Sequence, residues 1–346
     1  MYNVKIITGG NSDNMFRQLP NGQNISKCGR YRFFIDEDIK DPDFLVVRNK
    51  YICRKTDYTV APQNTLLLIS EPTSIIRFPK SYCRQFAMMS TCQEGMNHPN
   101  AIYHQANLPW FVGINDKGAI NPKTNVTYDS LKNAPFPEKN KIISVITSNK
   151  SFTKGHQDRI DFVAKLKEYY GDKIDIFGRG FNDFEDKWDV LAPYKYHIAI
   201  ENSSSNYYWT EKLSDCYLTG TFPIYYGCKN IADYFPQNSY KEIDIHDFDA
   251  AIKIIDKVIS EDSYFSSIKD LEKSKNLVLD EYNIFDHIVD CCNKMNPDAK
   301  KQCITFHPAN TMLNIHNLYY YTIGRNVFKA INFFKSAPKK VSKGEK

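Results

Sequence analysis

The sequence predicts an α/β protein made of two halves, each built around a parallel sheet. Strand-like and helix-like segments alternate along the 346-residue chain, which is typical of βαβ units. Several strand-like segments are continuous apolar runs, which suit inner strands that are buried on both faces. The chain is long enough for two cores, and its hydrophobic fraction of 42% and charged fraction of 25% are ordinary for a globular protein.

The clearest strand of the first half covers residues 65–70, where Thr-Leu-Leu-Leu-Ile-Ser is stopped by Glu71-Pro72. Pro72 keeps Glu71 out of the helical region, so we expect the strand to end there. Other segments of the first half predict strands at 4–8, 31–35, 44–48 and 86–90, and helical character at 79–85. Residues 117–140 are rich in Lys, Asn, Pro and Asp, and we interpret them as an interdomain linker.

The second half begins with a buried strand at 141–147, followed by an amphipathic helix at 156–170 that Gly171 closes as a C-cap. Further strands are predicted at 173–177, 196–200 and 222–226, and further helices at 210–219, 250–260 and 264–282. These segments predict an N-terminal domain of residues 1–140 and a C-terminal domain of residues 141–304. Residues 337–346 form a basic tail that we expect to be disordered.

Charge and cysteine content narrow the class of protein. The net charge of +5 is too mild to indicate a nucleic-acid partner. The nine cysteines are odd in number and show no metal-binding spacing, which favours reduced thiols in a cytosol. The N-terminus lacks the apolar region of a signal peptide, and no apolar run is long enough to span a bilayer. We therefore expect a cytoplasmic protein.

Polar residues gather where the strand at 196–200 ends. That strand ends at Glu201, a polar loop follows, and Thr210 caps a helix that begins with Glu211-Lys212. In open α/β sheets, ligands bind beyond the carboxyl ends of the strands, and a helix N-terminus there favours a phosphate group. Lys212 would normally oppose the helix dipole, but an anion between the two removes the conflict. Glu211 can accept hydrogen bonds from ribose or sugar hydroxyls.

This segment resembles the donor-binding signature of the family 10 α-1,3-fucosyltransferases. The shared features are Glu-Asn-Ser at 201–203, Thr-Glu-Lys at 210–212 and Pro-Ile-x-x-Gly at 223–227, matched without a gap from Glu201 to Gly227. Similarity continues through 231–236 and 243–248, and upstream through 145–149 and 175–178, so it covers roughly residues 141–250. The N-terminal half resembles the family only weakly.

The resemblance implies a GT-B-like fold, with two Rossmann-like domains facing a central cleft and the donor bound by the second domain. It implies that Arg159, Asn202, Tyr208, Glu211 and Lys212 bind the donor, and we add Lys150 and Tyr226 to this donor-binding set. Arg159 and Lys212 would neutralise the diphosphate of GDP, Glu211 would contact ribose or fucose, and Asn202 and Tyr208 would lie near the nucleotide and sugar. Fixed cations suit this task because charge develops on the phosphate oxygens as GDP departs.

A general base is needed on the N-terminal domain to take the proton of the acceptor hydroxyl. We predict Glu71, which follows a buried strand, and the family likewise uses a glutamate after a strand of its N-terminal domain. Glu94 and Glu37 are the rivals, and Glu71 could also simply end its strand.

No metal or other cofactor is expected. Residues 36–38 (Asp-Glu-Asp) and 247–249 (Asp-Phe-Asp) match the Asp-x-Asp pattern with which many GT-A enzymes hold a divalent ion. The pattern is short and common by chance, and the second match lies where the resembling family needs no metal.

The sequence thus predicts an inverting, metal-independent transferase that moves L-fucose from GDP-fucose to a hydroxyl of a glycan. Two alternatives stay open: the same fold with a different nucleotide sugar, and a non-catalytic glycan-binding protein on a decayed transferase fold. The segment at 305–336 also has two interpretations. It packs back on the N-terminal domain, or its aromatic and basic residues lie on the inner face of an anionic membrane, as would suit a lipid-linked acceptor.

Overall fold

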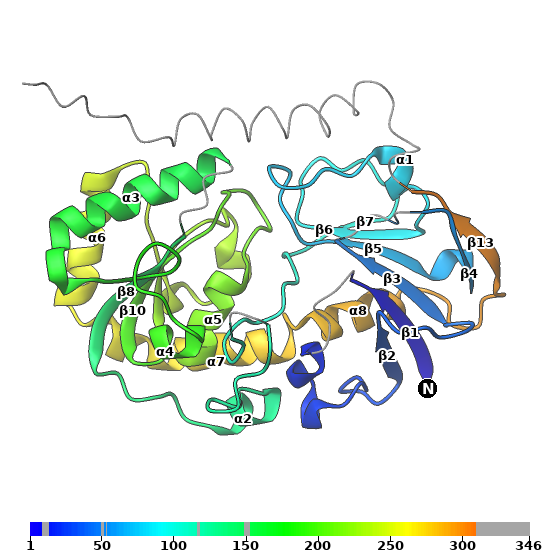
Figure 1. Ribbon diagram of the computed structural model, residues 1–346, viewed down its shortest axis with the longest axis horizontal. Coiled ribbons are helices and arrows are strands. Elements are labelled where there is room, and N and C mark those ends of the chain that lie inside the picture. Colours follow the sequence, from blue (N-terminus) through cyan, green and yellow to red (C-terminus); the bar gives the residue numbers. More distant parts are fainter. Residues whose placement is uncertain (9–13, 50–51, 53, 116–117, 149–152, 309–346) are drawn as a thin grey trace, which may run out of the picture.

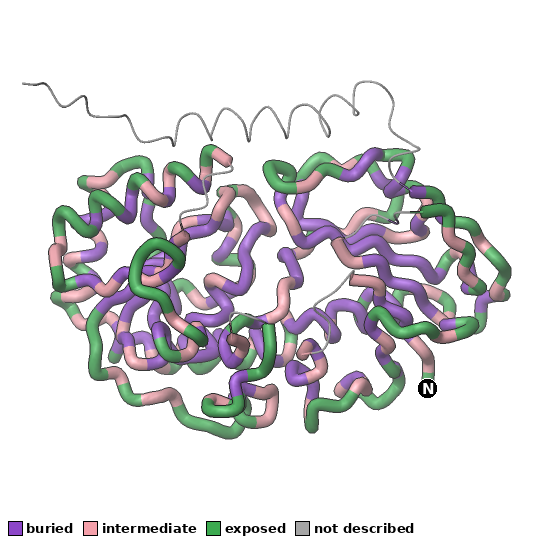
Figure 2. Tube along the Cα trace, in the orientation of Figure 1, coloured by how far each residue is buried: buried purple, intermediate pink, exposed green. Residues whose placement is uncertain are grey.

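The computed structural model describes residues 1–8, 14–49, 52, 54–115, 118–148 and 153–308. It shows two α/β halves side by side, each with its own parallel sheet (Figure 1). Buried residues follow the strands of both halves, as the purple segments of Figure 2 show. This is the predicted GT-B-like arrangement of two facing α/β units.

The first sheet has six parallel strands in the order β2-β1-β3-β5-β6-β7. The strands are β1 (Tyr2–Ile7), β2 (Tyr31–Ile35), β3 (Phe44–Arg48), β5 (Thr65–Ile69), β6 (Met88–Thr91) and β7 (Ala101–Tyr103). All five residues of β5 are buried, as expected for a continuous apolar run in the interior of a parallel sheet.

The second sheet has five parallel strands in the order β12-β11-β10-β8-β9. The strands are β8 (Lys141–Ile146), β9 (Asp175–Phe177), β10 (Tyr194–Ile200), β11 (Phe222–Tyr226) and β12 (Lys241–Glu242). The first strand, β8, lies between β9 and β10, so the strand order reverses between β8 and β10. Ligands of open α/β sheets bind at such a reversal, beyond the carboxyl ends of the strands.

Helices cover both sheets, and side-chain caps or glycines mark several of their ends. They are α1 (Lys80–Cys83), α2 (Tyr128–Asn133), α3 (Lys154–Tyr170), α4 (Lys187–Leu191), α5 (Glu211–Thr219), α6 (Phe248–Ser260), α7 (Ser263–Asp280) and α8 (Ile284–Asn293). Gly171 ends α3 at φ 58° and Gly220 ends α5 at φ 68°, positive φ values that glycine adopts without strain. The predicted helices of the second half are therefore present within a few residues.

The chain crosses between the halves more often than the predicted boundary at residue 140 implies. Trp110, Val112 and Leu131 pack in the core of the second half, although the prediction assigned them to the first. Residues 117–140 are thus not a plain linker, because they include α2, which has a capping box at Thr127 and buries Leu131.

The second crossing is made by α7 and α8, which run along the base of both halves in Figure 1. Ile284, Phe285 and Ile288 of α8 pack in one core with Val4 and Phe33 of the first sheet. The predicted C-terminal domain of residues 141–304 therefore includes a helix that belongs to the first half. Its apolar face is explained by the sheet that it covers.

A small sheet that the sequence did not predict also joins distant segments. Strand β13 (Gln302–Phe306) pairs antiparallel with β4 (Thr56–Val60), and Phe306 is buried against Phe86. The predicted segment at 305–336 is described only as far as residue 308, so its two interpretations, and the tail at 337–346, lie outside the described residues.

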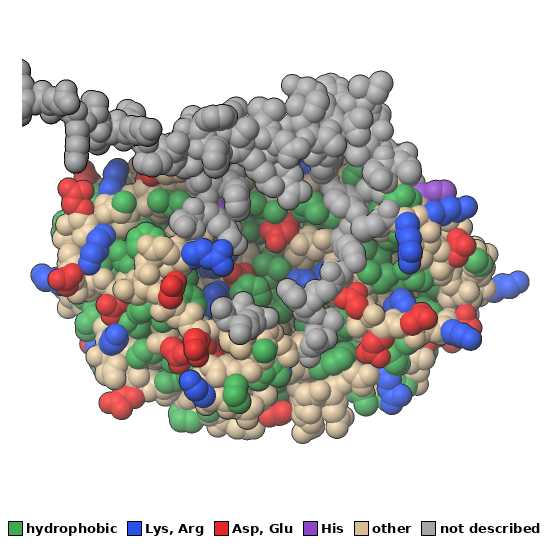
Figure 3. Space-filling view, in the orientation of Figure 1, with side chains coloured by type: hydrophobic (Ala, Val, Ile, Leu, Met, Phe, Trp, Pro, Cys, Tyr) green, Lys and Arg blue, Asp and Glu red, His purple; other side chains and the backbone are tan. Residues whose placement is uncertain are grey.

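Basic and acidic side chains are interspersed on the face shown in Figure 3. Among the helices that the structure describes, none combines the length and the apolar character needed to cross a membrane.

Candidate active site

The candidate site is a cleft between the carboxyl ends of the two sheets. Residues 72–74 and 92–94 of the first half line one wall, and residues 153–155, 201–205 and Tyr226 of the second half line the other. The second wall lies where the strand order reverses between β8 and β10. Both sheets therefore direct their loops toward one shared space.

Glu201 is a buried carboxylate that holds the second wall together through hydrogen bonds and an ion pair. It ends β10 with 1% of its surface exposed, and one carboxylate oxygen accepts hydrogen bonds from the backbone N and the Oγ1 of Thr210, both at 2.8 Å. The other oxygen lies 3.3 Å from Lys212 Nζ. Gly227 lies so near that an added Cβ would stand 2.5 Å from Glu201 Cγ. Close packing therefore fixes this carboxylate under the first turn of α5.

The first turn of α5 holds the predicted pair Glu211 and Lys212. Thr210 caps the helix by accepting the N–H of Lys212 at 3.3 Å. Glu211 lies 3.4 Å from Lys212 Nζ and 3.5 Å from Lys187 Nζ. Burial alone would raise the pKa of Glu211, but Lys212 and Lys187 outweigh it and lower the pKa to about 2. Burial alone would lower the pKa of Lys212, but Glu201 and Glu211 raise it. Both side chains are therefore charged.

Arg159 reaches the same point from α3. Its guanidinium donates to the amide oxygen of Asn202 and lies 3.4 Å from Ser148 Oγ, so it bridges the ends of β10 and β8. The side chain is buried, and its Nε has no hydrogen-bond partner among the described residues. Burial lowers the pKa of Arg159, with Glu201 and Glu211 acting in the opposite direction. A buried guanidinium with an unused donor is suited to an anionic ligand.

Glu71 lies two residues after β5 and directly precedes residues 72–74, which line the opposite wall. Its backbone oxygen accepts a hydrogen bond from Gln93 Nε2 at 2.8 Å, which fixes the turn. Burial raises the pKa of Glu71, and Glu211 of the other half raises it further, while Lys212 and Arg48 lower it. The structure thus brings the predicted base into the electrostatic reach of the predicted donor residues. A carboxylate with a raised pKa is a better proton acceptor near neutral pH.

The family model for glycosyltransferase family 10 (fucosyltransferase), C-terminal part, matches residues 136–307, which contain all of these donor-side groups. The chain belongs to glycosyltransferase family 10. An α-(1,3)-fucosyltransferase FucT of Helicobacter pylori is 35% identical over 101 residues, which cover 29% of this chain and 18% of that protein. The α-(1,3)-fucosyltransferase B of Drosophila melanogaster is 23% identical over 329 residues, which cover 86% of this chain and 68% of that protein. The crystal structure of an α1,3-fucosyltransferase with GDP aligns with a TM-score of 0.47 and 17% identity, over 84% of this chain and 91% of that chain.

The remaining predicted residues of this family 10 chain lie in different surroundings. Tyr226 lines the cleft, and its hydroxyl lies 3.1 Å from His246 Nε2. Tyr208 is 2% exposed and packs with Cys92 and Ala106 of the first half, so its ring joins the two walls. Lys150 lies outside the described residues.

The two rivals of Glu71 are placed less favourably for proton transfer. Glu94 lines the cleft, but one of its carboxylate oxygens accepts a hydrogen bond from Asn206 at 2.7 Å. Glu37 is exposed in the loop after β2, away from the residues that flank Glu71.

The two Asp-x-Asp motifs have local partners. Asp247 caps α6 by accepting the N–H of Ala250 at 3.1 Å, and Asp36 accepts the N–H of Thr8 at 2.8 Å. In the described part of the chain, no three His, Cys, Asp or Glu side chains are grouped as metal ligands.

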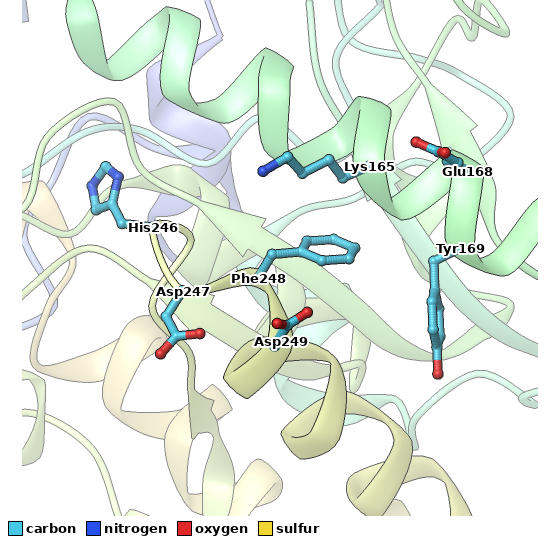
Figure 4. Close-up of a pocket in the computed structure, with 7 residues that line it drawn as sticks. All are labelled: Lys165, Glu168, Tyr169, His246, Asp247, Phe248 and Asp249. Atoms are coloured by element: carbon cyan, nitrogen blue, oxygen red, sulfur yellow. The ribbon is translucent and has the colours of Figure 1, made fainter.

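A second hollow lies between α3 and the start of α6 (Figure 4). The Phe248 ring lines it, with Lys165 Nζ at 5.7 Å from the ring centroid and the Tyr169 ring packed edge-on at 6.4 Å. His246 also lines this hollow and contacts Tyr226 of the cleft, so the two spaces adjoin.

Three charged residues of the site were not predicted. Glu201 was interpreted only as a strand end. Lys187 of α4 forms ion pairs with Glu211 and Asp215 of α5. Arg48 lies near Glu71. The position of Glu201 inside the matched Glu-Asn-Ser segment was a usable signal. Lys187 and Arg48 stand in segments without any distinguishing pattern.

Proposed function

We propose that this chain transfers L-fucose from GDP-fucose to a hydroxyl of a glycan, with inversion at the anomeric carbon and without a metal ion. One observation carries the proposal: Arg159 and Lys212, from two different helices, meet at the reversal of the second sheet, opposite Glu71 of the first. Membership of a fucosyltransferase family supports fucose as the transferred sugar.

The reaction we propose is a single displacement. The acceptor oxygen forms a bond to C1 of fucose while the bond from C1 to the β-phosphate oxygen breaks. Glu71 takes the proton of the acceptor hydroxyl, and the electron pair of the broken bond leaves with GDP. The new bond forms on the face opposite the departing GDP, so the configuration at C1 inverts.

Arg159 and Lys212 would stabilise the charge that develops on the phosphate oxygens. Lys212 already faces Glu201 and Glu211, which keep it protonated, and the unused Nε of Arg159 offers a further donor. Glu211 is ionised, so it is able to accept hydrogen bonds from sugar or ribose hydroxyls. These cations would perform the charge neutralisation that a divalent ion performs in other transferases, and we expect activity to persist in EDTA.

The test is incubation of the purified protein with GDP-fucose and a panel of galactose- and N-acetylglucosamine-terminated oligosaccharides. We expect a product one fucose heavier by mass spectrometry, together with GDP release. Lys212→Met, which keeps the length of the side chain and removes its charge, should lower turnover by about 10²-fold or more. Exposed Lys241→Met is the matched control.

A nucleotide panel tests the donor separately. Binding to the native state alone raises the melting temperature, so GDP should raise it more than UDP or ADP at the same concentration. Stabilisation by UDP but not by GDP would overturn GDP-fucose as the donor. A strict requirement for Mn²⁺ would overturn the metal-independent mechanism.

A further inference from the structure

The loop between β10 and α5 contacts the first half of the molecule through Ser203, Asn206 and Tyr207, in addition to the packing of Tyr208 on Cys92 and Ala106. Ser203 Oγ lies 2.9 Å from Ser74 Oγ, and Asn206 Nδ2 donates to Glu94 Oε1 at 2.7 Å. The ring of Tyr207 stacks on the ring of Tyr103, with centroids 5.7 Å apart and planes inclined by 23°. Ser74, Glu94 and Ser203 line the cleft, so these contacts span the candidate site itself.

The three partners come from three successive strands of the first sheet. Ser74 follows β5, Glu94 follows β6, and Tyr103 is the last residue of β7. The carboxyl ends of parallel neighbours meet at one edge of a sheet, so the loop lies along that edge. One loop of the donor half is therefore held to the acceptor half at successive strands.

Tyr207 has a backbone conformation that tyrosine rarely adopts. Its φ is 63°, in the left-handed region that bulky side chains disfavour. The conformation is held by Asn230, whose Oδ1 accepts the N–H of Tyr207 at 2.7 Å, and by the stack on Tyr103. Strained residues persist only where their surroundings hold them in place, and they gather at functional sites.

The contact residues of this loop and of its partners lie close in the chain to the proposed base and to the proposed phosphate ligands. Glu71 precedes Ser74 by three residues, and Gln93, next to Glu94, donates its side-chain amide to the backbone oxygen of Glu71. In the second half, Ser203 directly follows Asn202, whose amide oxygen accepts a hydrogen bond from the guanidinium of Arg159.

We propose that residues 203–207 are a spacer that sets the position of Glu71 relative to the donor phosphates, with Tyr103 and Tyr207 as positioning residues. This inference rests on the proposed fucosyl transfer. Proton abstraction from an acceptor requires close alignment across the two halves, and a displacement of about 1 Å can cost about 10²-fold in rate. The residues that we propose to bind GDP all belong to the second half.

The decisive variant is Tyr103→Ala, with Tyr103→Phe as its matched control. Tyr103 is 39% exposed and lies outside the donor half, so its loss leaves the phosphate ligands in place. We expect the kcat for transfer to fall about tenfold or more, since alignment is lost. The Kd for GDP should stay within about twofold, and hydrolysis of GDP-fucose by water should rise relative to transfer. Tyr103→Phe keeps the ring and should match the wild type.

Asn206→Ala removes the neighbouring contact to Glu94 and should give the same signature if the loop acts as one unit. The inference is overturned if both alanine variants keep the wild-type kcat and the wild-type ratio of hydrolysis to transfer. It is also overturned if the Kd for GDP weakens in parallel with kcat, because the loop then acts through the donor pocket alone. A wild-type protein that neither hydrolyses nor transfers from GDP-fucose would refute the proposed function itself.

Discussion

Two features of Glu71 have separate origins: its position after a buried strand follows from the sequence, and its raised pKa follows from the tertiary structure. The sequence explains why a carboxylate stands at the end of a buried strand, because Glu71-Pro72 stops the apolar run at 65–70. The structure adds the neighbours that alter its acidity. Burial and the negative charge of Glu211 raise the pKa of Glu71, although Lys212 and Arg48 act against them. These opposing charges come from segments that are far apart in the chain.

At the residue scale, we predict that Glu71→Gln lowers the kcat for transfer by about 10²- to 10⁴-fold, the usual contribution of a general base. The affinity for GDP should not change, because the phosphate ligands are untouched. In the wild type, kcat/KM should fall as pH falls, since protonation removes the base. The midpoint of that fall should lie above the ordinary glutamate pKa of about 4.3, because the pKa of Glu71 is raised.

The control for this prediction is exposed Glu37→Gln, which should keep the wild-type rate and pH profile. A pH–rate profile measured on both variants and the wild type decides the matter. Full transfer by Glu71→Gln would remove Glu71 from its role and return attention to Glu94.

At the scale of an element, α3 depends on a glycine in its first turn. A Cβ at Gly155 would lie 2.1 Å from the backbone oxygen of Asn202, closer than any real contact. The start of α3 therefore packs directly on the loop after β10, and this approach lets Arg159 reach Asn202 one turn later. Periodicity alone predicted the helix but not this requirement, because the close neighbour comes from another strand.

We predict that Gly155→Ala weakens GDP binding about tenfold and destabilises the protein by about 1–3 kcal/mol, the usual cost of overpacking. In an ordinary helix the same change would stabilise the protein by about 0.5–1 kcal/mol, so the sign of the change in unfolding free energy distinguishes the two cases. Gln157→Ala, at an exposed position two residues further on, is the control and should change neither quantity appreciably. Isothermal calorimetry and chemical denaturation measure the two effects. A stabilised Gly155→Ala protein with unchanged affinity would contradict the close contact.

At the scale of the whole molecule, the two halves are not independent stretches of chain. Trp110, Val112, Val126 and Leu131 complete the core of the second half, and α8 completes the core of the first. Phe285 of α8 is fully buried, with its ring 4.9 Å from the ring of Phe33 and 5.9 Å from that of Phe16. A truncation at residue 140 would therefore expose apolar surface in both halves.

We predict that Phe285→Ala destabilises the protein by about 3–5 kcal/mol, the usual cost of removing a buried aromatic ring. The loss should be concentrated in the first half, where hydrogen exchange of β1 and β2 should accelerate most. Phe265→Ala, whose ring is 61% exposed on α7, is the control and should cost less than about 1 kcal/mol. Equal acceleration of exchange in β10 and β11 would contradict this assignment of α8.

Local pattern determined much of this protein. The apolar run at 65–70, the caps Thr210 and Gly171, and the Glu-Asn-Ser and Thr-Glu-Lys segments were enough to predict the two α/β halves, the helix over the proposed phosphate site and its family. These features are local because they depend on the hydrogen bonds and the burial of neighbouring residues in the chain.

Only the tertiary structure decided which distant segments meet. In the folded protein Glu201 lies beside Lys212, and Glu71 lies close enough to Glu211 for their charges to interact. Helix α8 packs on the first half, and the ring of Tyr103 stacks on that of Tyr207. The physical reason is that an apolar face is buried against any complementary apolar surface, and a charged group pairs with any opposite charge that the fold brings near. That choice depends on how both sheets pack and not on spacing along the chain.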